Sequence, residues 1–259
     1  MQHLKIAMLQ ADLVWHNAAQ NRKNFSEKIN QIKEQIDLII LPEMFSTGFT
    51  MHPQEIFETM EGETVKWMQK TAAEKKSAIA GSVVILEGEK YYNRFLFVHP
   101  SGEINFYDKW HLFTLVGEDK VYEIGKEKLI VTYKGWRICP MVCYDLRFPV
   151  LARNVEDYDL LIYVANWPKI RIVAWDTLLK ARSIENMCYT IGVNRVGIDA
   201  NNYEYNGHSA AFNCLGELVA ETKENIEEIA VFTLDKNHIS KIRNSLGFLN
   251  DRDTFEIKR

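Results

Sequence analysis

The chain has 259 residues, of which 47% are hydrophobic, and its formal net charge is −4 at pH 7. A chain of this length can bury a large core, and α/β layers of this size commonly form one domain. The mildly acidic balance, with lysines and arginines spread among carboxylates, excludes a basic surface for nucleic acid or for an anionic membrane. We therefore expect a small-molecule partner.

The amino end, residues 1–5, lacks a signal pattern, and no apolar run approaches the ~20 residues needed to cross a bilayer, so we expect a cytoplasmic protein with no membrane partner. The cysteines are too few and too scattered for a disulfide scaffold, which fits a reducing compartment. They are Cys139, Cys143, Cys188 and Cys214. Neither cysteines nor histidines show zinc-ligand spacing, and no phosphate- or dinucleotide-binding glycine motif occurs, so we expect no metal and no cofactor.

The amino-terminal half predicts strands alternating with helices. Helical spacing of apolar residues predicts helices over 17–35 and 64–76. Short apolar runs bounded by turn residues predict strands over 4–10, 37–41, 77–86, 91–98 and 103–109. The last three follow one another without helices, which indicates hairpins.

The segment 110–127 contains Gly117 and Gly125 and has no clear period, so we expect a loop over the site. The carboxyl-terminal half again predicts both kinds of element, with a helix beginning at Pro149 and another over 175–186. Further strands are expected over 129–131, 138–142, 160–164, 187–196, 207–213, 218–221 and 226–234, followed by a basic tail. The alternation indicates layered α/β architecture with mixed sheets in one domain, residues 1–259.

Cys143 stands where an apolar strand gives way to the helix that begins at Pro149. Such a sharp strand-to-helix turn presents its side chain outward beside a group of backbone N–H donors, which is the geometry of a nucleophile elbow. On position alone, a cysteine in an apolar run is more often a small buried hydrophobe. The functional interpretation therefore needs a base and a cation nearby.

Both are available in the sequence. The apolar strand over 37–41 leads to Glu43, and the strand over 103–109 ends at Lys109. Taken singly, each would more often be a surface carboxylate or a solvated cation. Together with Cys143 they place a base, an ammonium and a thiol at three strand ends, which indicates nucleophilic catalysis.

At these positions the chain resembles the nitrilase (carbon-nitrogen hydrolase) superfamily. The matching motifs, in chain order, are LPEMFSTGF, YDKWHLF, VCYDLRFP, YVANWP and NRVG. Their combination is similar to the branch of bacterial ω-amidases that act on 2-oxoglutaramate. The resemblance implies a four-layer α-β-β-α sandwich with two mixed β-sheets in a single domain, and a homodimer.

The chemistry needed for an amide assigns Cys143 as the nucleophile and Glu43 as the general base, with a Cys thioester as intermediate. Lys109 would stabilise the oxyanion together with the backbone N–H of Tyr144. The resemblance implies that Glu118 supports the lysine and the attacking water, although a solvated loop carboxylate is the alternative. It also implies that Trp167 lines the pocket, although a core aromatic residue is nearly as plausible.

The expected reaction is hydrolysis of 2-oxoglutaramate, or a related monoamide such as succinamate, to the dicarboxylate and ammonia. Within the family, a deaminated glutathione amidase and an N-carbamoyl hydrolase are alternatives. Outside it, the rivals are a Cys–His enzyme with His111 or His208 as base, and a fold that only binds a partner.

Four further basic residues have open or structural roles in this interpretation. Arg147 is expected to tie the elbow to a neighbouring acid, although orienting a substrate carboxylate is the alternative. Arg195 could pair with a substrate carboxylate, but the sequence does not rank it above Arg171 or Lys169.

Overall fold

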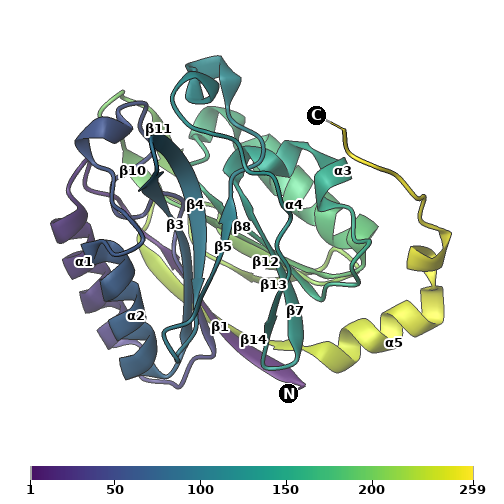
Figure 1. Ribbon diagram of the computed structural model, residues 1–259. Helices are drawn as coiled ribbons and strands as arrows, with labels where there is room; N and C mark the ends of the chain where they lie inside the picture. Colours follow the sequence, from purple (N-terminus) through teal and green to yellow (C-terminus); the bar gives the residue numbers. More distant parts are fainter. Residues whose placement is uncertain (1, 259) are drawn as a thin grey trace.

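The computed structural model describes residues 2–258 of the chain. Two six-stranded sheets pack face to face, and helices cover both outer faces (Figure 1). Each sheet contains both parallel and antiparallel neighbours. The structure therefore confirms the expected α-β-β-α sandwich with two mixed sheets.

The first sheet has the strand order β14-β1-β2-β3-β4-β5, in which only the β1–β2 and β2–β3 pairs are parallel. Its strands are β1 (His3–Gln10), β2 (Leu38–Ile40), β3 (Ala78–Glu87), β4 (Lys90–Val98), β5 (Ile104–Asp108) and β14 (Glu228–Asp235). A tight turn joins β3 to β4, and Gly88 adopts a positive φ of 61° there, which suits glycine.

The second sheet has the order β13-β12-β9-β8-β7-β6, and its parallel pairs are β7–β8 and β8–β9. Its strands are β6 (Val131–Tyr133), β7 (Trp136–Val142), β8 (Leu160–Ala165), β9 (Tyr189–Asn194), β12 (Ala210–Phe212) and β13 (Leu218–Glu221). A separate antiparallel pair, β10 (Val196–Ile198) and β11 (Glu204–Asn206), forms a small ribbon near the site.

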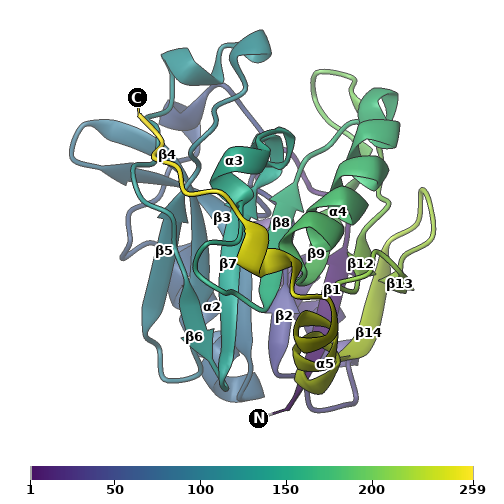
Figure 2. The ribbon, with the colours of Figure 1, turned by 90° about the vertical axis from the view of Figure 1, so that its right-hand side faces the viewer.

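Helices α1 (Ala18–Gln31) and α2 (Glu63–Lys75) cover the outer face of the first sheet (Figure 1). Helices α3 (Pro149–Ala152), α4 (Ile172–Asn186) and α5 (Lys236–Leu246) lie on the side of the second sheet (Figure 2). None of the helices within residues 2–258 is both long and apolar enough to cross a membrane.

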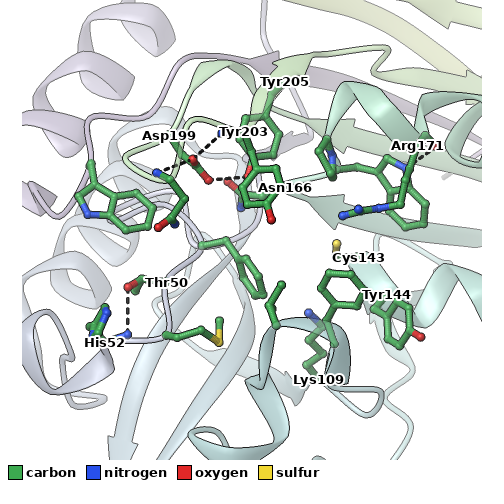
Figure 3. Close-up of a pocket in the computed structure, with 18 of the residues that line it drawn as sticks. Thr50, His52, Lys109, Cys143, Tyr144, Asn166, Arg171, Asp199, Tyr203 and Tyr205 are labelled. Carbon is green, nitrogen blue, oxygen red and sulfur yellow. Dashed lines mark hydrogen bonds between the residues drawn. The ribbon is translucent and has the colours of Figure 1, made fainter.

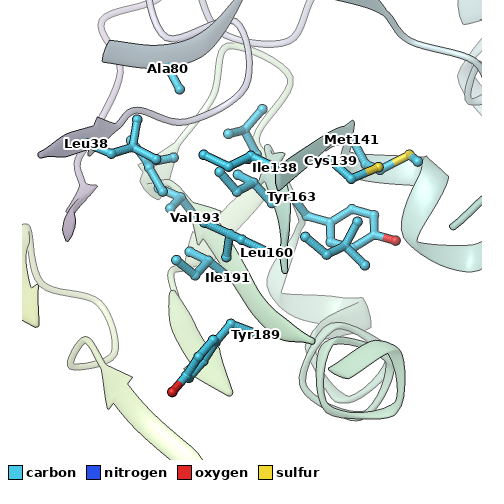
Figure 4. Close-up of a cluster of buried hydrophobic side chains, with 14 of the residues drawn as sticks. Leu38, Ala80, Ile138, Cys139, Met141, Leu160, Tyr163, Tyr189, Ile191 and Val193 are labelled. Atoms are coloured by element: carbon cyan, nitrogen blue, oxygen red, sulfur yellow. The ribbon is translucent and has the colours of Figure 1, made fainter. Parts of the chain in front are cut away.

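Alternation along β1 places its side chains in two different layers of the core. In β1, Leu4, Ile6 and Met8 point into the cluster between the two sheets, whereas Ala7 and Leu9 point into the cluster beneath α1 and α2. Successive strand residues point to opposite faces of a sheet, so a strand buried on both faces must be apolar throughout. Figure 4 shows part of the cluster that contains Leu4, Ile6 and Met8; both sheets contribute to this cluster, which continues across the second sheet to α4.

The structure departs from the sequence expectations at a few boundaries. Helix α1 ends at Gln31 instead of residue 35, because Ile32 is already extended. The strand expected over 187–196 is interrupted between β9 and β10. The loop over 110–127 contains two short 3₁₀ turns.

The largest difference is at the carboxyl end, where residues 236–246 form α5 instead of only a basic tail. The side chain of Asp235 accepts a hydrogen bond from the backbone N–H of Asn237, which caps the first turn. Ile239 is the single buried residue of this helix. One buried apolar position gives too weak a periodic signal to recognise a helix from sequence.

Candidate active site

Three strands deliver the candidate catalytic groups to one end of the sandwich. Glu43 follows β2, Lys109 directly follows β5, and Cys143 directly follows β7. The side chains of Glu43 and Lys109 are buried, and Lys109 and Cys143 both line the same pocket (Figure 3). The two sheets therefore bring together the carboxylate, ammonium and thiol that the sequence singled out.

Lys109 lies between two carboxylates. Its Nζ is 3.1 Å from Oε1 of Glu43 and 2.9 Å from Oε2 of Glu118. Burial alone would lower the pKa of Lys109, but Glu118 and Glu43 outweigh that effect and hold the pKa above its ordinary value. The ammonium is therefore charged throughout the neutral range.

Glu118 is buried rather than solvated, so the alternative of a solvated loop carboxylate is wrong. Its Oε2 accepts a hydrogen bond of 2.5 Å from the backbone N–H of Phe113, within the same loop. Burial raises the pKa of Glu118, while Lys109 opposes that rise. The loop returns to the sheet through Gly125, whose N–H donates to the carbonyl of Lys109 over 2.9 Å.

The carboxylate of Glu43 is oriented by three close donors. Nδ2 of Asn93 donates to Oε1 over 2.8 Å, and the backbone N–H of Asn166 donates to Oε2 over 2.7 Å, in addition to the contact from Lys109. Nδ2 of Asn166 also donates to the backbone carbonyl of Glu43 over 2.7 Å. A carboxylate has about four lone-pair positions, and Nδ2 of Asn166 also approaches Oε2 at 3.5 Å, so donors from the protein surround this carboxylate.

Cys143 has the elbow geometry expected from the sequence. Its φ is +46°, a conformation that is uncommon for a residue with a side chain, and it begins a 3₁₀ turn over Cys143–Arg147. Asp145 holds the turn: one carboxylate oxygen accepts the N–H of Val142 over 3.0 Å, and the other accepts the N–H of His111 over 2.8 Å. The hydroxyl of Tyr107 also donates to Asp145 over 2.7 Å.

The thiol of Cys143 is neutral in the resting site. Burial raises its pKa well above the ordinary value, the negative charge of Glu43 raises it further, and Lys109 opposes both effects. The other cysteines are fully buried, whereas Cys143 is partly exposed at the pocket. Burial likewise raises the pKa of Cys188, to about 12.

The pocket has a volume of about 120 Å³. Tyr144 and Trp167 both line it, as the sequence interpretation expected. The backbone N–H of Trp167 donates to Oδ1 of Asn194 over 2.8 Å, which fixes the backbone of Trp167. Other aromatic residues in the lining are Trp15, Phe49, Phe113, Tyr203 and Tyr205. These side chains enclose a space suited to a small molecule.

The two histidines of the rival Cys–His interpretation are engaged elsewhere. His111 stacks on Phe148 at a centroid distance of 3.7 Å, and its ring lies 2.9 Å from Asp145. His208 lies between the carboxylates of Asp176 and Glu224. Among the described residues that line the pocket, neither histidine is present.

The expected tie between Arg147 and a neighbouring acid is wrong. In the part of the chain from 2 to 258, Arg147 makes no ion pair, and its guanidinium lies 5.0 Å from the ring centroid of Trp167. Instead, Arg182 supports the elbow by donating from Nη2 to the carbonyl of Leu146 over 2.6 Å. Arg195 is buried and pairs with Asp12 at 2.7 Å.

Sequence reasoning missed the groups that orient Glu43 and Cys143. Asn166 stands inside the YVANWP motif, and that motif is the sequence signal that could have marked it as a site residue. Asn93 lies inside β4 and Asp145 directly follows the elbow residues, and neither has a distinctive local pattern. Between residues 2 and 258, no group of three or more His, Cys, Asp or Glu side chains is arranged to hold a metal ion.

Comparison with known proteins gives concordant results. The family model described as carbon-nitrogen hydrolase matches residues 5–244. Omega-amidase YafV of Yersinia enterocolitica is 46% identical, over 86% of each chain, and 2-oxoglutaramate amidase of Bacillus subtilis is 30% identical, over 95% of this chain and 96% of the relative. The crystal structure of XC1258 from Xanthomonas campestris, a CN-hydrolase superfamily protein, is 41% identical and superposes with a TM-score of 0.97 over 100% of both chains.

Proposed function

The chain belongs to the carbon-nitrogen hydrolase family and is an amidase, and within that class we propose that it is an ω-amidase. The proposed substrates are 2-oxoglutaramate and related monoamides of dicarboxylic acids, such as succinamate, which it would hydrolyse to the dicarboxylate and ammonia. The names of the Yersinia and Bacillus relatives support this substrate class.

The observation that carries the proposal is the buried arrangement of Lys109 between Glu43 and Glu118, beside the thiol of Cys143. Amide hydrolysis needs a nucleophile, a proton for the departing ammonia and stabilisation of an oxyanion. In this proposal Cys143 is the nucleophile, Glu43 transfers the protons and Lys109 stabilises the oxyanion.

In the first half-reaction, Sγ of Cys143 attacks the amide carbon while its proton passes to Glu43. A thiol with a raised pKa needs this base, because little thiolate exists before attack. The carboxylate of Glu43 receives the proton. Glu43 then delivers it to the leaving nitrogen, the carbon–nitrogen bond breaks, and ammonia departs from a thioester.

Lys109 and the backbone N–H of Tyr144 stabilise the oxyanion in this proposal. Lys109 suits the role because its charge is fixed by Glu43 and Glu118 before substrate arrives, so no reorganisation accompanies the reaction. One preorganised donor of this kind typically contributes roughly 10²–10³ in rate. Cys143 has the positive φ of a sharp turn, and such a turn gathers backbone N–H groups beside a nucleophile.

In the second half-reaction, Glu43 removes a proton from water, and the resulting hydroxide attacks the thioester carbon. The carbon–sulfur bond breaks, and Cys143 recovers a proton from Glu43. Glu118 acts through Lys109 by holding the ammonium in place, and it completes the polar surroundings of the water. The net reaction consumes one amide and one water and yields one carboxylic acid and ammonia, which at neutral pH become a carboxylate and an ammonium ion.

We also propose that residues 1–259 form one domain and that the protein is a homodimer. Apolar side chains are exposed along the outer face of the second helix layer, on and next to α3 and α4. They are Val150 at 54%, Ile170 at 83%, Val173 at 75% and Ile184 at 48% exposure. Exposed apolar side chains gathered in one helix layer are typical of a protein–protein contact.

A cytoplasmic location is proposed on separate grounds. All four cysteines are free. Unpaired cysteines are typical of a reducing compartment.

The substrate assignment is tested by measuring kcat/KM for ammonia release from several amides. The panel contains 2-oxoglutaramate, succinamate, glutamine, deaminated glutathione and an N-carbamoyl amino acid. We expect 2-oxoglutaramate to be hydrolysed most efficiently, with succinamate next and glutamine far behind. Preference for deaminated glutathione or the N-carbamoyl compound would replace the ω-amidase proposal with that alternative.

A further inference from the structure

Most basic side chains near the pocket are already paired. Lys169 follows the YVANWP motif but pairs at the surface with Glu204, at 2.9 Å. Arg195 is not among the described residues that line the pocket, and it pairs with Asp12 at 2.7 Å. Neither therefore has a free charge to offer a bound molecule.

Lys109 does line the pocket, but its charge is also balanced. Two carboxyl groups, from Glu43 and Glu118, contact its single ammonium. A substrate carboxylate placed here would meet more negative than positive charge. The part of the pocket next to Lys109 therefore favours the neutral amide end of a substrate.

Arg147 and Arg171 are different, because they line the pocket without an acidic partner. The guanidinium of Arg147 lies 5.0 Å from the ring centroid of Trp167, and that of Arg171 lies 5.1 Å from the ring centroid of Phe113. Within residues 2–258, neither guanidinium makes an ion pair or a side-chain hydrogen bond. The two charges face the cavity uncompensated.

The aromatic contacts orient these guanidinium groups without using their donors. A guanidinium stacks through its face, whereas its N–H groups lie in the plane and bind carboxylates in a two-pronged geometry. The ring of Trp167 is itself anchored, because its Nε1 donates to the carbonyl of Arg171 over 2.8 Å. Figure 3 shows Arg171 on the same side of the pocket as Cys143.

Asp199 is the other charged residue in the lining, and it does not compete for the two arginines. One of its carboxylate oxygens accepts the hydroxyl of Tyr205 over 2.8 Å. The other accepts the backbone N–H groups of Asn201, over 2.8 Å, and Tyr203, over 3.0 Å. Asp199 is therefore occupied in shaping its own loop.

We propose that Arg147 and Arg171 form a carboxylate subsite that binds the end of the substrate remote from the amide. This inference rests on the proposed ω-amidase function and adds the residues that recognise its substrate class. The carboxylate binds to the two arginines, and the neutral amide then lies at Cys143, next to Lys109 and its two carboxylates. The unequal charge of the two ends thus sets the orientation of the substrate.

The test compares two amides that differ only in the remote group: succinamate, with a carboxylate, and butanamide, with a methyl group. For Arg147→Gln and for Arg171→Gln, we expect the ratio of kcat/KM for succinamate to that for butanamide to fall roughly 10- to 100-fold, the range for losing a charged hydrogen-bond partner. The fall should appear mainly in the KM for succinamate. Lys169→Gln is the matched control and should leave the ratio unchanged.

A second measurement is independent of turnover. The dissociation constant of succinate, measured by calorimetry, should rise roughly tenfold or more in each arginine variant and stay constant in Lys169→Gln. Arg171→Lys should recover only part of the affinity, because an ammonium cannot form the two-pronged contact. Melting temperatures establish that each variant is folded.

The outcomes separate this inference from the proposed function. Unchanged substrate ratios and unchanged succinate binding in both arginine variants would overturn the carboxylate subsite, even if the enzyme is an ω-amidase. Failure of the unmodified enzyme to hydrolyse any dicarboxylic monoamide would instead overturn the proposed function. Succinate binding would still decide whether the two arginines recognise a carboxylate.

Discussion

Nζ of Lys109 lies 3.1 Å from Oε1 of Glu43, and the side chains of both residues are almost completely shielded from solvent. Moving two charged groups out of water costs free energy, and only close pairing of the two charges offsets that cost. Such a buried pair contributes little to stability. Its presence at the pocket is better explained by a catalytic use of the Lys109 ammonium.

Removing the ammonium should therefore leave a costly defect. We expect Lys109→Met to lower the free energy of unfolding by about 3–5 kcal/mol, because Glu43 and Glu118 would then face each other without a cation. Urea unfolding measures this change. The double substitution Lys109→Met with Glu118→Gln should recover part of the loss, and a fully additive result would contradict the coupling between these charges.

The general base can be distinguished from a histidine by comparing three variants. Glu43→Gln should abolish detectable turnover, since no other group in this proposal accepts the thiol proton. His208→Gln should stay within about threefold of the unmodified enzyme, and His111→Gln should lose less than about tenfold, as it only supports Asp145. Steady-state rates on succinamate decide the matter. A histidine variant as inactive as Glu43→Gln would point to a Cys–His mechanism.

Alkylation should report the raised pKa of Cys143. Raising a thiol pKa reduces the thiolate fraction at neutral pH, so the labelling rate should climb as the pH increases and should show no plateau below pH ~9. Iodoacetamide labelling followed by peptide mass analysis identifies the modified residue. Cys143 should react before Cys139, Cys188 and Cys214, which are buried. A rate plateau near pH 7 would show that Cys143 rests as a thiolate.

The proposed dimer contact is tested by placing a charge on its apolar face. Ile170→Asp combined with Val173→Asp should shift the sedimentation mass to the chain weight of 30.2 kDa, whereas the unmodified protein should sediment at twice that mass. Burying unpaired carboxylates in a contact is strongly unfavourable. Ile226→Asp, exposed by 51% elsewhere, is the control and should remain dimeric. A monomeric unmodified protein would refute the dimer proposal.

The sequence identified the residues whose chemistry is distinctive at a strand end. The apolar run over 37–41 had to be a buried strand, so the carboxylate of Glu43 at its exit was conspicuous. Cys143 was recognisable because Pro149 marks a helix soon after an apolar strand. These signals are local, and the residue types themselves suggest the reaction.

The supporting groups could not be predicted because their roles depend on which strands become neighbours. Asn93 is one polar residue within β4, and it reaches Glu43 only because β4 lies in the same sheet. Sequence could not rank Arg171 above Arg195 either. The difference lies in Asp12, a partner 183 positions away in the chain that neutralises Arg195.

The most direct test of the central claim is the turnover of 2-oxoglutaramate by Cys143→Ala beside Cys139→Ala. Cys139 lies four residues earlier in β7 and is buried, so it controls for the loss of a thiol from the same strand. The account predicts that Cys143→Ala loses roughly 10⁴-fold or more in kcat with an unchanged melting temperature, while Cys139→Ala keeps most of its activity. Substantial turnover by a folded Cys143→Ala enzyme would contradict the thioester mechanism.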